Sequence, residues 1–201
     1  MECVVCGRYQ DKLTKGMCRK HYQQWIKHNT VLDHNSRTVF DLNEIILHNN
    51  YAEMLIYNRL GDKIASTYID LDDVDKVKKY KWGLEGRYIK NKEVGKLHRF
   101  IMSCPEDKLV DHINHNSLDN RRKNLRICTY QQNNMNVSIS KRNKSGVVGV
   151  SFHKASKKWA ARIKLNKKDI WLGSFEFIED AIKARREAEI KYFGEYRNKH
   201  Q

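Results

Sequence analysis

The chain has 201 residues, with 39 Lys and Arg against 24 Asp and Glu, a formal net charge of +15 and a mean hydropathy of −0.79. No stretch approaches the roughly 20 apolar residues of a membrane span, and no apolar signal region follows Met1. We therefore expect a cytoplasmic protein with no membrane contact. Aromatic residues make up 10% of the chain and proline occurs once, which argues against disorder. A basic globular protein attracts polyanions, so nucleic acid is the predicted partner.

The excess positive charge lies toward the two ends of the chain. Residues 1–32 hold six Lys/Arg against two Asp/Glu, and residues 141–201 hold sixteen against seven. Between them, residues 33–97 hold eleven of each sign and residues 98–140 hold six against four. This distribution favours separate modules with different roles. We predict a multi-module α+β fold with modules at 1–32, 33–97, 98–140 and 145–197.

The first module carries a pattern of metal ligands. Cys3 and Cys6 form one pair, and Cys18 and His21 form a second pair eleven residues later. Two such pairs are typical of tetrahedral zinc, and a segment of this size cannot bury a stable core without a metal. We predict a structural Zn²⁺ bound by these four residues; the alternative is four unrelated residues in a reducing compartment. The segment resembles zinc knuckles of the CxxC…CxxH type, which implies a structural role or contact with the DNA backbone.

Short helices and strands are expected next. Residues 20–28 predict a helix, and alternating patterns predict strands at 38–42, 52–57 and 64–69, the last two forming a hairpin. Residues 70–80 predict a charged helix. Its acidic start lacks the glycine and closing glutamate of a calcium loop, so we expect it to be solvated. This small antiparallel β-rich module is assigned a scaffolding role.

The module at 98–140 holds the residues that suggest chemistry. Asp111 and His112 are adjacent, Asn124 lies thirteen residues beyond Asp111, and Asn133 lies twenty-two residues beyond it. Carboxylate and amide oxygens suit Mg²⁺, and a neutral imidazole takes up a proton from water near pH 7. The sequence therefore predicts a carboxylate, an imidazole and carboxamides around one divalent ion.

Strand patterns at 109–110 and 125–127 bracket a polar loop, and residues 130–137 can form a helix. With the spacings above, this stretch resembles the His-Asn-His (HNH) endonucleases, closest to the phage-type homing branch, whose fold is a ββα-metal finger. The alternative is an Asn-rich loop that only connects two strands, because asparagine often satisfies loop backbone. Cys104 and Cys128 are predicted to be small buried hydrophobic residues.

The resemblance implies roles for individual residues. His112 would be the general base that polarises the attacking water, and Asp111 and Asn133 would hold one Mg²⁺ or Mn²⁺ against the scissile phosphate. Asn124 would pin the loop by hydrogen bonds. His98 matches a histidine that this branch often carries, and both a catalytic and a structural role are open for it. Cleavage would leave 5′-phosphate and 3′-hydroxyl ends.

Residues 145–197 show three short alternating segments followed by a helical pattern at 179–193. We predict a three-stranded antiparallel sheet with one helix across it, and Gly194 ends that helix. The segment resembles the Apetala-two DNA-binding domain of plant transcription factors. The matching residues are Gly149-Val150, Lys158-Trp159-Ala160-Ala161, Trp171-Leu172-Gly173-Ser174-Phe175, Ala181 and Phe193-Gly194. The plant target sequence does not carry over, because the first strand here lacks the usual arginines.

A basic strand face with aromatic rings fits the major groove of double-stranded DNA. The predicted DNA contacts are Lys158, Trp159, Arg162, Lys164 and Trp171, with His115 and Asn116 of the polar loop as further candidates. For each tryptophan a core position is an equally open alternative, and for the two loop residues so is a satisfied surface loop.

Three functions are therefore open. The first is a homing-type HNH endonuclease, which as a monomer would nick one strand and as a weak dimer could break both. The second is a sequence-specific DNA-binding regulator whose finger no longer cuts, and the third is a restriction or repair HNH nuclease. The intact set of Asp111, His112 and Asn133 favours a nuclease, because a regulator has no need to keep it.

Overall fold

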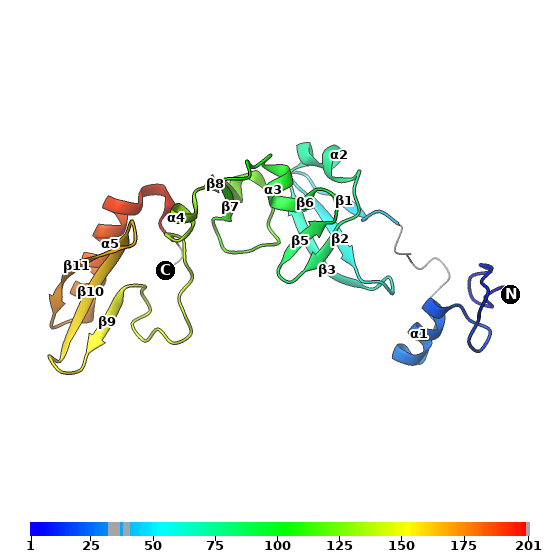
Figure 1. Ribbon diagram of the computed structural model, residues 1–201, viewed down its shortest axis with the longest axis horizontal. Coiled ribbons are helices and arrows are strands. Elements are labelled where there is room, and N and C mark those ends of the chain that lie inside the picture. Colours follow the sequence, from blue (N-terminus) through cyan, green and yellow to red (C-terminus); the bar gives the residue numbers. More distant parts are fainter. Residues whose placement is uncertain (32–36, 38–40, 200–201) are drawn as a thin grey trace. The chain divides into compact units, whose positions relative to one another are not determined.

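The computed structural model describes residues 1–31, Arg37 and residues 41–199, with the helices and strands labelled in Figure 1. Residues 38–40 of the strand expected at 38–42 lie outside the described part of the chain. Within the described part, no helix is both long enough and apolar enough to cross a membrane.

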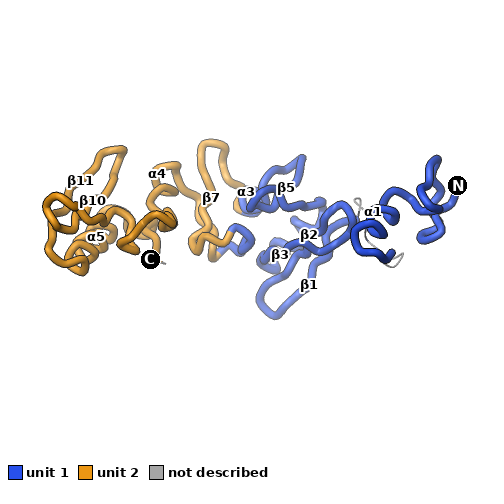
Figure 2. The backbone as a smooth tube through the Cα atoms, turned by 90° about the horizontal axis from the view of Figure 1, so that it is seen from below, with its two compact units in different colours: residues 1–101, 117–122 blue, residues 102–116, 123–201 orange. Residues whose placement is uncertain are grey.

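The chain divides into two compact units (Figure 2). Unit 1 comprises residues 1–101 and 117–122, and unit 2 comprises residues 102–116 and 123–201. Each unit mixes helices and antiparallel strands, which agrees with the expected α+β class. The predicted module at 98–140 does not follow this division, because residues 98–101 and 117–122 group with unit 1. The four predicted modules stay a prediction.

Unit 1 begins with a small folded segment around helix α1 (Arg19–His28). The helix begins after Cys18 and ends at Asn29, which adopts a left-handed conformation with φ of 51°. Its core consists of the buried residues Cys3, Met17 and Cys18, with Leu13, Tyr22 and Trp25 packed against them. A core of this size supplies little stability by itself.

The rest of unit 1 holds two three-stranded antiparallel sheets. The first is β1 (Ile45–Leu47), β2 (Ala52–Tyr57) and β3 (Lys63–Ile69), and the second is β4 (Gly83–Glu85), β5 (Tyr88–Asn91) and β6 (Gly95–Lys96). The helical elements are η1 (Leu71–Asp73), α2 (Val74–Val77) and α3 (Leu97–Ile101). The predicted hairpin at 52–69 is confirmed, and its turn is closed by Asn58, whose side-chain oxygen accepts from the backbone of Leu60 and Asp62.

The acidic start of the predicted helix at 70–80 is only partly solvated. Asp72 and Asp75 are exposed as expected, but Asp73 is 2% exposed. Arg122 donates from Nε and Nη2 to the Asp73 carboxylate at 2.9 and 2.7 Å. The expectation was wrong for Asp73, because a buried carboxylate is tolerated when a guanidinium pairs with it and hydrogen-bonds to it.

Unit 2 contains a two-stranded ribbon, a short helix, a three-stranded sheet and a long helix. The ribbon is β7 (Leu109–His112) with β8 (Leu125–Cys128), and the short helix is α4 (Tyr130–Asn133). The sheet has the order β11-β10-β9, from β9 (Val150–His153), β10 (Lys158–Leu165) and β11 (Lys168–Phe175). Helix α5 (Ile178–Phe193) follows, and η3 (Gly194–Tyr196) continues from its end; η2 (Arg122–Asn124) precedes β8. The strands and helices expected at 109–137 and 150–193 are present, although α4 is shorter than expected.

One predicted DNA contact, Trp159, lies on the inner face of the β9–β11 sheet. It pairs with Phe152 and Phe175 of the neighbouring strands, and it packs against the core that includes Ala161 and Ala181. The expectation that Trp159 shares a face with Arg162 was therefore wrong. Trp159 and Arg162 are three positions apart on β10, so the two-residue alternation of side chains along a strand already puts them on opposite faces. The register shift beside Ala161 and Arg162 leaves Leu172 of β11 without a partner on β10.

The two isolated cysteines differ in burial. Cys128, at the end of β8, is buried as expected, and burial raises the pKa of its thiol. Cys104 is only half-buried, so the expectation of a fully buried residue was wrong there.

Candidate active site and metal centre

The β7–β8 ribbon determines where the central residues of the candidate site lie. Asp111 pairs with Arg126 across the ribbon, and His112 pairs with Leu125. Asp111 and His112 are both buried. Opposite charges on directly paired residues of an antiparallel ribbon attract each other at close range, so the register itself brings Arg126 to Asp111.

Asn124 fixes the chain immediately after His112. Its backbone carbonyl accepts from the N–H of Ile113 at 2.9 Å, and its side-chain Oδ1 accepts from the N–H of Asn114 at 3.0 Å. The side chain is buried, so these bonds are shielded from competing water. This arrangement agrees with the predicted pinning role of Asn124.

Three hydrogen bonds converge on a single oxygen of Asp111. Arg126 donates to Oδ2 from Nε at 2.9 Å and from Nη2 at 2.7 Å, and Asn136 donates to it from Nδ2 at 2.9 Å. Nδ2 of Asn136 also lies 3.2 Å from the carbonyl oxygen of His112. Neither Arg126 nor Asn136 was predicted as a partner of Asp111 from the sequence. The Asp111–Arg126 pairing could have been found from the hairpin register, whereas no sequence pattern singles out Asn136.

His115 belongs to the same network. The Asp111 carboxylate only accepts, so Asn136 must present its NH₂ group there, and its Oδ1 then accepts from Nε2–H of His115 at 2.9 Å. Nδ1 of His115 lies 2.5 Å from the Ser138 hydroxyl oxygen. Both ring nitrogens are used inside the protein, which favours the structural alternative over a phosphate contact for His115.

Asn116 and Asn133 lie in more accessible positions. Asn116 is exposed, and its backbone N–H is held by the side chain of Asn114 at 2.8 Å. Asn133 is the last residue of α4, a helix that packs against both β7 and β8. It is half-buried, and its side chain makes no hydrogen bond within the described part of the chain.

The donor chemistry around Asp111 fits a hard divalent ion. All three hydrogen bonds to this carboxylate fall on Oδ2, so Oδ1 is the oxygen that could bind an ion. The amide oxygen of Asn133 would be a second hard donor. Mg²⁺ and Mn²⁺ are commonly held by one or two such protein oxygens together with phosphate and water.

His98 lies in unit 1, on the short helix α3. It is buried, and its ring centroid lies 5.2 Å from that of Tyr88 on β5. This packing gives His98 a structural place in the scaffold, and a catalytic role for it stays a prediction.

The predicted zinc ligands come together in unit 1. The ligand atoms of Cys3, Cys6, Cys18 and His21 all lie within 4.8 Å of one another. Nδ1 of His21 lies 3.3 Å from the sulfurs of Cys3 and of Cys18. Three sulfurs and one imidazole nitrogen at such separations suit the tetrahedral coordination of Zn²⁺.

Electrostatics in this cluster favour a thiolate. Burial alone would raise the pKa of the Cys3 thiol, but hydrogen bonds from the Cys18 backbone and the His21 ring oppose burial. The net effect lowers the pKa of Cys3 from 9.0 to about 5. A deprotonated sulfur is the form that binds a metal ion.

The outer face of the β9–β11 sheet carries four of the five predicted DNA contacts. Lys158, Arg162 and Lys164 alternate along this face of β10 and are exposed. Trp171, which is 62% exposed, pairs with Arg162 from β11. A cationic strand face with one exposed aromatic ring is an arrangement suited to a DNA groove.

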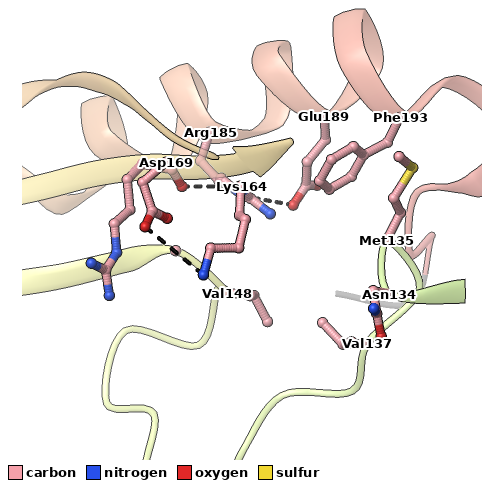
Figure 3. Close-up of a pocket in the computed structure, with 11 residues that line it drawn as sticks. Asn134, Met135, Val137, Val148, Lys164, Asp169, Arg185, Glu189 and Phe193 are labelled. Carbon is pink, nitrogen blue, oxygen red and sulfur yellow. Dashed lines mark hydrogen bonds and ion pairs between the residues drawn. The ribbon is translucent and has the colours of Figure 1, made fainter. Parts of the chain in front are cut away.

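Unit 2 also contains a cavity of about 350 Å³ behind this sheet (Figure 3). Its lining includes Met135 and Val137 from the segment after α4, and Arg185, Glu189 and Phe193 from α5. Two ion pairs lie in the lining: Nε of Arg185 donates to Glu189 at 2.9 Å, and Lys164 lies 3.9 Å from Asp169. Arg162, one of the predicted DNA contacts, also lines the cavity.

Comparisons with known proteins agree with the site. Residues 103–135, which include Asp111, His112, Asn124 and Asn133, match the family model of the HNH endonucleases. A protein of Acanthamoeba polyphaga mimivirus, named as an uncharacterized HNH endonuclease, is 44% identical over 93 residues. The match covers 42% of this chain and 49% of the relative, so the chain spans about half the length of that protein. No solved structure matches. Residues 103–135 of this chain are thus similar to the HNH endonuclease family.

Proposed function

We propose that the chain is a divalent-metal-dependent DNA endonuclease of the homing HNH type. The observation that carries the proposal is the arrangement in the HNH match and directly beside it: Asp111 is held at one oxygen by Arg126 and Asn136, and Asn124 pins the loop that follows His112. A finger that only connected strands would need neither a buried carboxylate nor a buried imidazole beside it.

In this proposal the residues divide the work of phosphodiester hydrolysis. His112 accepts a proton from the attacking water, and Asn124 keeps the backbone after His112 in place. Asp111 and Asn133 hold the ion, which when bound supplies positive charge to the scissile phosphate and to the leaving 3′ oxygen. The products are 5′-phosphate and 3′-hydroxyl ends.

The other predicted modules serve binding. Cys3, Cys6, Cys18 and His21 hold a structural Zn²⁺, and the outer face of the β9–β11 sheet contacts double-stranded DNA. One finger cuts one strand, so a monomer nicks, and a dimer would be needed to break both strands at once. The alternatives are a DNA-binding regulator with an inactive finger, and a restriction or repair nuclease.

A plasmid-nicking assay tests the nuclease function. Supercoiled plasmid is incubated with the full-length protein and Mg²⁺ or Mn²⁺, and conversion to the open circle is followed on a gel. We expect His112→Ala to lower the nicking rate by at least about a hundredfold, because a general base contributes 10²–10⁴-fold, while DNA affinity is kept.

His28→Ala, an exposed histidine in unit 1, is the matched control and should nick like the wild type. A wild-type protein that binds DNA but never nicks it with either ion would favour the regulator instead. Equal nicking by His112→Ala and wild type would exclude the proposed general base.

A further inference from the structure

The segment that follows helix α5 reaches the candidate nuclease site at two points. We call residues 195–198 the C-terminal clasp. At the first point, the Glu195 carbonyl accepts a hydrogen bond from Arg126, which itself binds Asp111. At the second point, Asn198 donates a hydrogen bond to the carbonyl of Val137, the residue that follows Asn136. All of these residues belong to unit 2.

The first arm of the clasp consists of Glu195 and Tyr196, which contact the Arg126 guanidinium. Nη1 donates to the carbonyl of Glu195 at 2.6 Å, and Nη2 lies 3.3 Å from the carbonyl of Tyr196. The Tyr196 ring lies under the guanidinium, 4.9 Å from its carbon to the ring centroid. The near side of the same group makes two bonds to Asp111. A planar fork with five donors can bridge a carboxylate and two carbonyls at once, which an ammonium group cannot.

The second arm is Asn198. Its side chain donates from Nδ2 to the carbonyl of Val137 at 2.9 Å, and the residue is only 8% exposed. Val137 directly follows Asn136, which donates to Oδ2 of Asp111. Each arm therefore supports one of the two side chains that fix the same carboxylate oxygen.

We propose that the C-terminal clasp is a positioning element of the nuclease site, and that it presents Oδ1 of Asp111 to the catalytic ion by holding Arg126 and Asn136. This inference rests on the proposed nuclease function and adds to it. The segment that ends the predicted DNA-binding module becomes a part of the cutting machinery, although it lies about 70 residues beyond Arg126 in the sequence.

The physical reason is the cost of orienting a carboxylate. A carboxylate that rotates freely loses conformational entropy when it binds an ion, and it can present the wrong oxygen. Partners that orient a ligand from behind typically contribute 10–100-fold to metal affinity or to activity. The positive charge of Arg126 would repel a nearby metal ion. If Arg126 increases metal affinity, it must therefore do so by orienting the Asp111 carboxylate and not by its charge.

Three variants of the full-length protein test the clasp. Asn198→Ala removes the hydrogen bond to the Val137 carbonyl while Asp111, Arg126 and Asn136 keep their side chains. Arg126→Lys keeps the charge and loses the fork, and Arg126→Gln loses both. Asn91→Ala is the matched control, because Asn91 in unit 1 also donates from Nδ2 to a backbone carbonyl, that of Lys81, at 2.9 Å.

Two measurements read out the effect. The first is the dissociation constant for Mn²⁺ on the protein–DNA complex, measured by electron paramagnetic resonance. We expect Asn198→Ala and Arg126→Lys each to raise this constant about tenfold or more, and Asn91→Ala to leave it unchanged. DNA affinity measured with EDTA should stay the same in all variants.

The second measurement is amide hydrogen exchange, which needs no metal and no cleavage. We expect faster exchange at residues 109–113 in Asn198→Ala, with unchanged exchange at residues 158–175 of the sheet. Unchanged exchange at 109–113 overturns the clasp even if the wild type proves not to be a nuclease.

The two proposals can fail separately. If the wild type nicks DNA and Asn198→Ala and Arg126→Lys bind Mn²⁺ as the wild type does, the clasp is wrong and the nuclease function stands. If Arg126→Lys matches the wild type in both measurements, the planar fork of Arg126 is not needed, and the positioning role is again overturned.

Discussion

At the scale of single residues, unit 2 contains a charged pair whose burial is unusual. Arg185 and Glu189 lie one turn apart on α5, 2.9 Å from each other, and their side chains are 5% and 9% exposed. Arg185 also donates from Nη1 to the backbone carbonyl of Arg162 at 2.9 Å. Burial raises the pKa of Glu189 while Arg185 opposes that rise, and burial lowers the pKa of Arg185. Each charge is therefore tolerable only while its partner is present.

Because each charge depends on its partner, we expect replacing Arg185 alone to destabilise the protein more than replacing both Arg185 and Glu189. Arg185→Met alone should lower the free energy of unfolding by about 3–5 kcal/mol, because it leaves Glu189 charged and unpaired in the interior. Adding Glu189→Leu should recover most of that loss. Denaturant unfolding of the two variants and the wild type, monitored at the tryptophans, measures the difference. A double variant as unstable as the single one would show that the guanidinium matters through other contacts.

Acidification provides a second check on the same pair. A carboxyl whose pKa is raised by folding is most favourable at low pH, and its contribution is lost as pH rises through the folded pKa. Without Arg185 the rise is unopposed, so the stability deficit of Arg185→Met relative to wild type should shrink as pH falls toward about 4.3, the ordinary pKa of glutamate. A deficit independent of pH would mean that Glu189 is not the group responsible.

At the scale of elements, the N-terminal segment around α1 is held together by few apolar contacts. Its buried core is Cys3, Met17 and Cys18, and two of these three residues are also predicted metal ligands. If the ligand cluster binds zinc, the free energy of metal binding becomes folding free energy for this segment.

Replacing one ligand should therefore affect both metal content and local structure. Cys18→Ser should lose one Zn²⁺ per chain, measured by atomic emission, and speed up amide exchange across α1 while the β1–β3 sheet keeps its protection. Cys104→Ser, a half-buried cysteine in unit 2, is the control and should keep its zinc. Unchanged zinc content in Cys18→Ser would contradict the predicted site.

Some strands and site residues could be predicted from the sequence, whereas contacts between distant segments could not. Strand alternation and turn residues located β2, β3, β10 and β11, because period and turn chemistry are local properties. Ligand spacing located the Cys/His cluster, and motif spacing located Asp111, His112 and Asn124. The contacts of Asp111 with Asn136 and of Arg126 with Glu195 depend on how distant segments pack. Trp159 is half-buried against the inner-face core, and the two-residue alternation of β10 could have predicted that it lies opposite Arg162.

At the scale of the whole molecule, the net charge of +15 is unevenly distributed. Residues 141–201 carry sixteen Lys/Arg against seven Asp/Glu, whereas residues 33–97 carry equal numbers. In the described part of β10, Lys158, Arg162 and Lys164 bring three cations to one exposed face. If that face binds DNA, then DNA affinity should depend more on where the positive charges lie than on the total net charge of the chain.

The salt dependence of DNA binding distinguishes an effect of where the charges lie from an effect of the total net charge. Each phosphate neutralised by a Lys or Arg contributes about 0.9 to the slope of log affinity against log salt concentration. The triple variant Lys158→Gln, Arg162→Gln, Lys164→Gln should therefore bind more weakly and reduce the slope by up to about 2.7, measured by fluorescence anisotropy with EDTA present.

The control removes the same number of charges from exposed lysines of unit 1, as Lys78→Gln, Lys79→Gln, Lys92→Gln. Because these lysines lie in the segment of zero net charge, the slope should stay within about 0.9 of the wild type, the equivalent of one phosphate. Equal losses in the two variants would mean that a general positive field, and not the outer face of the β9–β11 sheet, binds the polymer. A reduced slope confined to the first variant would place the phosphate contacts on the outer face of the β9–β11 sheet.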